Sequence, residues 1–113
     1  MDDSDWLNGG DVAITVCDRQ GIIIYMNEQA RRTFAADGGK ALVGKSLMDC
    51  HPETARQKIR AIMETGASNS YTIEKNGVKK LIHQAPWFQD GEMGGLAEFS
   101  MVIPVSLPHF VRG

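Results

Sequence analysis

Residues 18–30 read DRQGIIIYMNEQA, and this stretch decides the fold of the chain. Ile22 to Met26 is apolar and largely β-branched, which is typical of a strand. Asp18 to Gly21 has turn chemistry, and a second apolar run, from Val12 to Cys17, precedes this turn. The two runs therefore predict a β-hairpin.

Helical signals follow the hairpin. Asn27 ends the second strand and suits the N-cap of a short helix, and another short helix is expected at 45–50. A longer helix is expected at 52–65, because Pro52 suits its first turn and Gly66 suits its C-terminal cap. The apolar residues of this longer helix recur at helical spacing on one side: Ala55, Ile59, Ile62 and Met63.

The last third of the chain predicts three more strands, at 68–74, 78–87 and 96–103. Asn76-Gly77 and Asp90-Gly91 mark the turns between them, and Pro86 indicates an edge position or a bulge. This order of elements predicts the α+β fold class, with a five-stranded antiparallel sheet and with short helices and one longer helix packed on one face. We expect an N-terminal segment at 1–10, one domain at 11–104 and a C-terminal tail at 105–113.

Composition narrows the range of functions. The 113 residues include 12 Lys+Arg and 14 Asp+Glu, a net charge of −2, which argues against a nucleic acid partner because such interfaces need a positive surface. No apolar run approaches the roughly 20 residues of a transmembrane helix, and the acidic start is unlike a signal peptide. We therefore expect a cytoplasmic protein with no membrane partner. Cys17 and Cys50 form no metal-ligand cluster, so we expect free thiols and no metal site.

Four motifs stand in order along the chain: DRQG at 18–21, NEQA at 27–30, LVGK at 42–45, and DG at 90–91 with GG at 94–95. In this order and spacing the chain resembles the PAS family of sensory domains over residues 11–104. The resemblance implies a sheet whose concave face and helices enclose a cavity. In the family this cavity holds haem, flavin, a small metabolite or only side chains, and the outer face of the sheet often forms a dimer.

A pocket between the sheet and the helices is therefore the expected site. Its candidate cofactor-binding wall comprises Leu47, Cys50, His51, Ala55, Ile59, Ile62 and His83. Strand alternation places His83 on the same face as Leu81 and Ala85, but it does not show which face lines the cavity. A structural or surface role for His83 is the alternative.

The resemblance allows two cofactors to be compared with the residues. Flavin photosensors of the family carry their reactive cysteine at the position that matches Leu47, so cysteinyl-flavin photochemistry is disfavoured. Haem-binding members usually place their proximal histidine in the longer helix, which has no histidine here. His51 lies just upstream of that helix and keeps haem as a weak option.

Cys50 supports a lesser alternative function. It precedes a helix N-terminus, where the helix dipole favours a thiolate, and this predicts a thiol redox sensor. The plainer interpretation is that Cys50 packs as a small apolar residue and that His51 caps the helix.

The sequence contains no recognisable nucleophile–base set, phosphate-binding loop or metal-binding helix, so we expect no catalytic residues and no enzyme. Pro104 and Pro108 prevent a signalling helix directly after the last strand. We predict a free-standing sensory domain that binds a small ligand or cofactor and signals through contacts as a homodimer or with a partner signalling protein. The alternative is an interaction module that dimerises without a ligand.

Overall fold

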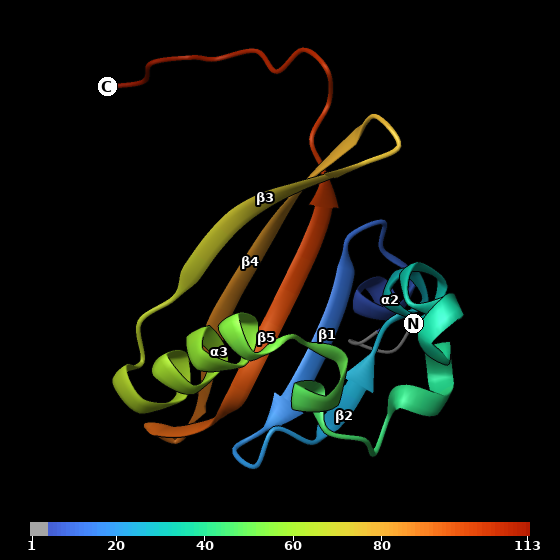
Figure 1. The fold of residues 1–113 in the computed structure, drawn as a ribbon. Coiled ribbons are helices and arrows are strands. Elements are labelled where there is room, and N and C mark those ends of the chain that lie inside the picture. Colours follow the sequence, from blue (N-terminus) through green and yellow to red (C-terminus); the bar gives the residue numbers. More distant parts are fainter. Residues whose placement is uncertain (1–4) are drawn as a thin grey trace.

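The computed structural model describes residues 5–113, apart from the side chain of Cys50. Five antiparallel strands form one sheet in the order β2-β1-β5-β4-β3 (Figure 1). Their bounds are β1 Ala13–Asp18, β2 Ile23–Met26, β3 Asn69–Lys75, β4 Val78–Gln89 and β5 Glu92–Val102. The predicted fold class is confirmed.

Helices and short 3₁₀ turns cover one face of this sheet, with α3 crossing β4 and β5 (Figure 1). Their bounds are α1 Asp5–Gly9, α2 Glu28–Thr33, η1 Ala35–Asp37, η2 Gly39–Leu42, η3 Leu47–Cys50 and α3 Glu53–Thr65. As predicted, Gly66 caps α3 in a left-handed conformation with φ of 76°. The longest helix of the described part has 13 residues, and no helix within residues 5–113 is long and apolar enough to span a membrane.

The core lies between the helices and the inner face of the sheet. Ile59 and Ile62 of α3 and Ala30 of α2 are buried there, together with Cys17 of β1 and Leu96 of β5. Full burial of each isoleucine side chain contributes about 1.5–3 kcal/mol to folding. The predicted apolar face of the longer helix therefore anchors it to the sheet.

Two tight turns set the register of the last three strands. Asn76 and Gly77 have φ of 53° and 78°, and Asp90 and Gly91 have φ of 53° and 80°, as a two-residue type I′ turn requires. Because the second turn needs only two residues, β4 and β5 pair immediately beside it, and β5 begins at Glu92. The predicted start of this strand at 96 is therefore too late.

Two glycines lie inside β5 because the Trp87 ring and the backbone of β1 approach that strand closely. A Cβ atom on Gly94 would overlap the Trp87 ring, and one on Gly95, whose φ is +154°, would overlap the backbone at Cys17. The indole Nε1 of Trp87 donates a hydrogen bond to the Cys17 carbonyl at 3.0 Å. The glycines thus let a side chain of β4 reach β1 across the strand between them.

Pro86 lies at a strand edge and next to an irregularity in the pairing, as the sequence indicated. Strand β3 starts opposite Gln84, so Pro86 lies beyond the paired part of β3, on a locally free edge of β4. A register irregularity follows between Trp87 and Phe88. The missing N–H of proline therefore removes no bond between β3 and β4.

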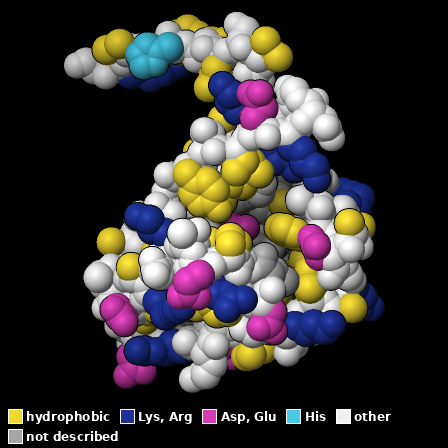
Figure 2. Space-filling view, viewed as in Figure 1, with side chains coloured by type: hydrophobic (Ala, Val, Ile, Leu, Met, Phe, Trp, Pro, Cys, Tyr) yellow, Lys and Arg dark blue, Asp and Glu magenta, His cyan; other side chains and the backbone are white. Residues whose placement is uncertain are grey.

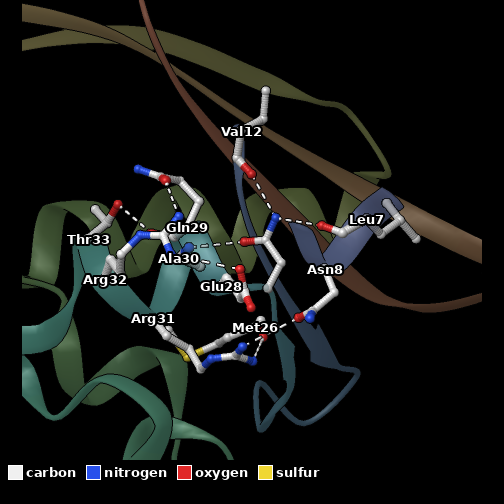
Figure 3. Close-up of polar contacts among 11 residues, drawn as sticks. Leu7, Asn8, Val12, Met26, Glu28, Gln29, Ala30, Arg31, Arg32 and Thr33 are labelled. Atoms are coloured by element: carbon white, nitrogen blue, oxygen red, sulfur yellow. Dashed lines mark hydrogen bonds and ion pairs between the residues drawn. The ribbon is translucent and has the colours of Figure 1, made fainter. Parts of the chain in front are cut away.

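Asn27 connects the N-terminal elements and is completely buried. Its Oδ1 accepts hydrogen bonds from the backbone N–H groups of Ile14 and Ala30 at 2.9 and 3.0 Å. Its Nδ2 donates to the carbonyls of Leu7 and Val12 at 2.8 and 2.7 Å (Figure 3). The predicted N-cap of α2 therefore also fixes α1 and β1.

The C-terminal residues leave the sheet and extend away from it (Figure 1). Residues 103–113 contain no helix or strand, and their apolar side chains are exposed: Val105, Leu107, Phe110 and Val111. An open groove of about 560 Å³ lies between this segment and the tip of the β3–β4 hairpin. This groove is far larger than the small pocket described below, but it is bounded by the edge of the sheet rather than by the core.

Candidate functional site

Polar side chains interrupt the apolar inner face of the sheet. Thr15 of β1, Gln84 of β4 and Glu98 of β5 are 5%, 2% and 7% exposed. Buried and outward-facing residues alternate along these strands. Thr15 is in phase with the buried Ala13 and Cys17, and Glu98 is in phase with the buried Leu96, so both face inward. Buried polar groups need hydrogen-bond partners, so the partners of these three show what the site can bind.

A directional relay of hydrogen bonds ends at Glu98. The Asn69 amide Nδ2 donates to Gln84 Oε1 at 3.1 Å. The Gln84 Nε2 then donates to Glu98 Oε2 at 2.9 Å. Since every donor of the relay points the same way, its inner end is a carboxylate that can accept further hydrogen bonds.

His51 faces the same carboxylate from the junction of η3 and α3. Its Nδ1 lies 2.8 Å from the Leu47 carbonyl, which can only accept, so Nδ1 carries the proton of this hydrogen bond. Its Nε2 lies 4.0 Å from Glu98 Oε2. Arg56 Nε donates to the His51 carbonyl at 2.8 Å and ties this junction to α3. The imidazole is thus held in one orientation, with Nε2 toward Glu98.

Thr15, His51 and Glu98 belong to the lining of a small pocket of about 20 Å³, although the surface that faces this space is apolar. The remaining lining is apolar: Met26, Phe34, Leu42 and Leu47. This volume holds about one water molecule, whereas pockets for drug-sized ligands occupy about 300–1,000 Å³. Haem therefore does not fit this cavity, although His51 lies in its wall.

A second hollow lies between α3 and β3. It has a volume of about 330 Å³ and is lined by Thr54, Ala55, Lys58, Asn69, Tyr71 and Gln84. The helix-covered face is hollowed near its centre, with hydrophobic side chains at the rim (Figure 2). Gln84 and Asn69 belong to the relay, so the relay runs from this hollow to Glu98 in the lining of the small pocket.

Two acidic groups near the relay have shifted pKa values. Burial raises the pKa of the Cys17 thiol above its ordinary value, and the negative charges of Asp18 and Glu98 add to this increase. Burial also raises the pKa of Tyr71, and the charge of Glu98 adds to it. Both groups are therefore neutral at pH 7.

The fold brings together only some of the residues predicted for the site. Leu47 and His51 line the cavity, Ala55 borders the open hollow, and Ile59 and Ile62 are buried in the core. The side chain of Cys50 lies outside the described residues, so its predicted roles stay predictions.

His83 is not brought to the cavity. It lies between the inward-facing Ile82 and Gln84, so its side chain is on the outer face of the sheet. There its Nδ1 lies 2.6 Å from Ser70 Oγ on β3. This contact joins two neighbouring strands on the outer face, away from the pocket.

Sequence reasoning missed Thr15, Gln84 and Glu98, although alternation carried a usable signal. Thr15 shares its strand face with Ala13 and Cys17, and Glu98 shares its face with Leu96. A polar residue on an apolar face marks a buried polar group. In contrast, no group of three or more His, Cys, Asp or Glu side chains that could hold a metal ion occurs among the described residues.

A family model described as PAS fold matches residues 7–103, and the chain belongs to this family. Domains of this family generally act as sensors in signal transduction rather than as catalysts. No curated protein sequence matches the chain.

Solved structures share the fold at low sequence identity. A PAS domain from Colwellia psychrerythraea is 18% identical, with a TM-score of 0.69 over 88% of this chain and 92% of its own. The Aer2 receptor of Vibrio cholerae, described as a dual PAS-haem oxygen sensor, is 21% identical, with a TM-score of 0.62 over 82% and 95%. The VqmA dimer of Vibrio cholerae is 15% identical, with a TM-score of 0.70 over 96% of this chain and 55% of its own.

Proposed function

We propose that this chain is a sensory PAS domain that binds a small ligand in the hollow between α3 and β3 and signals through contacts with another protein. The observation that carries the proposal is the volume of this hollow, about 330 Å³, with Asn69 and Gln84 of the relay in its mainly apolar wall. Such a combination of apolar lining and a few convergent polar groups is typical of small-molecule sites.

The position of His51 explains how ligand binding can change the packing of η3 against α3. The residue follows η3 directly, and its carbonyl accepts the hydrogen bond from Arg56 of α3. Ala55 of α3 lines the hollow, so a ligand bound there acts on α3 and, through Arg56, on its junction with η3. Binding would favour one packing of this junction over another, which is a shift between two populated states.

The first test compares the mass of the purified protein under native and denaturing conditions. We expect a surplus mass that disappears on denaturation and that identifies the ligand. A small molecule that binds should also raise the melting temperature in a concentration-dependent manner. If the native mass equals the chain mass and no compound of a metabolite library raises the melting temperature, ligand sensing is wrong.

A second candidate function, an interaction module, rests on the outer face of the sheet. Its apolar side chains are half-buried and lie on the face away from the helices: Ile14, Val16, Leu81, Ala97, Phe99 and Met101. A second copy of the chain would cover this face, and the VqmA structure is likewise described as a dimer. Light scattering of wild type and Phe99→Glu tests this function, with Leu107→Glu in the C-terminal tail as control. A wild-type monomer at micromolar concentration contradicts it.

The proposal also places the domain in the cytoplasm. Cys17 is a free, buried thiol, which suits a reducing compartment. Fractionation of cells that express the tagged protein tests this part, and recovery outside the cytoplasmic fraction overturns it.

A further inference from the structure

The two edges of the sheet differ in how they are covered. At the β2 edge, the backbone N–H of Ile23 donates to the Lys45 carbonyl at 2.9 Å, and the N–H of Gly44 donates to the Ile23 carbonyl at 2.8 Å. Strand β3 forms the other edge, and within residues 5–113 it pairs only with β4 (Figure 1). An open edge is a template on which another strand can pair. The β3 edge is therefore a candidate interaction surface.

The two-residue turn after β3 determines which of its backbone groups point away from β4. In such a hairpin the residues that flank the turn form a hydrogen-bonded pair, and these pairs alternate along the two strands. Lys75 pairs with Val78 across this turn, so the odd-numbered residues of β3 bond to β4. The N–H and C=O groups of Ser70, Thr72 and Glu74 therefore point toward the open edge.

Strand β3 is regular and is held in place. Its seven residues, Asn69–Lys75, include no proline and no glycine, and its pairing with β4 has no shift in register. Prolines and bulges are the devices that commonly block an open edge. Two side-chain hydrogen bonds, from Asn69 to Gln84 and between Ser70 and His83, also join β3 to β4. The free backbone groups are therefore presented in a fixed, extended form.

We propose that a second copy of this chain pairs its β3 antiparallel with this edge, in the register that places Thr72 opposite Thr72 of the second copy. This register pairs all seven residues of each β3 and forms about six backbone hydrogen bonds, two for each edge-facing residue. The two sheets thereby become one continuous sheet. The proposal goes beyond the sensory function and does not depend on a ligand.

The side chains of β3 are complementary to one another in this register. Tyr71 lies opposite Ile73 of the second copy, and these two side chains are 39% and 44% exposed in the single chain. An aromatic residue opposite a β-branched residue and threonine opposite threonine are favourable cross-strand pairs. The pairing therefore removes apolar surface from water as well as adding backbone hydrogen bonds.

Charge and strand length favour this register over its neighbours. Glu74 lies opposite Ser70 and Lys75 lies opposite Asn69, so each charge faces a neutral side chain. If the twofold axis lay at Glu74, two carboxylates would be directly opposite, which is destabilising. An axis at Ser70 would leave Glu74 and Lys75 without a partner strand. The axis at Thr72 avoids both costs.

Disulfide cross-linking of the full chain tests the register, in a Cys50→Ala background where the native Cys17 is buried. Thr72→Cys would place the two introduced thiols directly opposite, with Cα atoms about 5.5 Å apart, which suits a disulfide. Ser70→Cys is the matched control, because its two copies would lie about 14 Å apart. We expect at least fivefold more intermolecular disulfide from Thr72→Cys under mild oxidation. Equal amounts from the two variants overturn the proposal.

Light scattering at micromolar concentration tests the strength of the dimer. Thr72→Pro removes the central N–H of the open edge and keeps the hydrogen bonds to β4, so it should weaken the dimer at least tenfold. Ile73→Lys places a charge opposite Tyr71 and should have a similar effect, and urea denaturation shows whether each variant is folded. Phe99→Glu, on the outer face of the sheet, is the control and should leave this dimer unchanged.

The outcomes separate this edge from the other candidate surfaces. A dimer that Phe99→Glu abolishes and that folded Thr72→Pro and Ile73→Lys leave unchanged overturns the proposal and favours the outer face. A wild-type monomer also overturns it, and leaves the edge to an extended segment of a different protein. The native-mass and melting experiments do not depend on these results, so the sensory function is decided separately.

Discussion

The two buried polar centres of this domain differ in how completely their hydrogen bonds are satisfied. Asn27 uses both lone pairs of Oδ1 and both N–H bonds of Nδ2, each on a backbone group. Glu98 receives one hydrogen bond from Gln84 and faces His51 at 4.0 Å. A saturated group fixes structure, whereas an unsaturated one retains the capacity to bind. Asn27, at 0% exposed, therefore holds the fold, whereas Glu98, at 7% exposed, keeps acceptor capacity beyond its hydrogen bond from Gln84.

The largest expected effect on stability is at Asn27, whose hydrogen bonds are saturated. Asn27→Ala would leave four backbone groups of the N-terminal elements without their partner, so we expect a loss of about 3–5 kcal/mol in the free energy of unfolding. Urea denaturation measures it. Gln29→Ala, at a half-buried position of the same helix whose amide oxygen only accepts a hydrogen bond from the exposed Arg32, is the control and should change stability by less than about 0.5 kcal/mol. A loss of under about 1 kcal/mol for Asn27→Ala would contradict the structural role of Asn27.

Alkaline pH should have the next largest effect, because the Cys17 pKa is raised by burial and by the nearby charges of Asp18 and Glu98. The unfolded chain releases the thiol proton from about pH 8.5, while the folded chain retains it to higher pH. The folded state therefore binds more protons in this window, and stability falls as pH rises through it.

Denaturation curves between pH 8 and pH 10 measure this decline. The raised pKa of Tyr71 acts in the same direction, so Cys17→Ala should reduce the slope without abolishing it. An unchanged slope in Cys17→Ala would contradict the assignment to the buried thiol.

A smaller effect on stability is expected at the unsaturated centre. Glu98→Gln removes a buried charge that has few partners, so the lost hydrogen-bond strength is offset by a lower desolvation penalty. We expect the free energy of unfolding to change by less than about 1 kcal/mol, measured by urea denaturation beside Asn27→Ala. A loss as large as that of Asn27→Ala would show that Glu98 is also structural.

The smallest effect is expected on the outer face. Ser70→Ala removes the hydrogen bond to His83, which joins two exposed or half-buried side chains. Such a bond competes with water, and we expect a change below about 0.5 kcal/mol. A double-mutant cycle with His83→Ala measures the coupling energy between the two side chains. A value above about 1 kcal/mol would show that this pair contributes more to stability than expected.

Local patterns predicted most of the fold. The N-cap role of Asn27, the capping of α3 by Gly66 and the buried side of α3 all follow from residues close in sequence. The start of β5 was misplaced because Gly94 and Gly95 look like loop residues until the Trp87 ring is placed against them. That contact depends on tertiary structure, which composition does not reveal.

The candidate site was only partly predictable. His51 attracted attention as a histidine before a helix, and it lines the cavity. Glu98 and Gln84 look like ordinary polar residues in a mixed strand, and only the pairing of β4 with β5 brings them into contact. His83 was included because one strand alone does not show which face of a sheet is covered.

The contact between Trp87 and the Cys17 carbonyl gives the domain an intrinsic optical reporter. The chain has two tryptophans, and Trp6 is 65% exposed whereas Trp87 is hydrogen-bonded across the sheet. In a Trp6→Phe variant, fluorescence would come from Trp87 alone. Its emission wavelength would then report the packing of β4 against β1, and a change of that wavelength on adding a ligand would show that the ligand's effect reaches this contact.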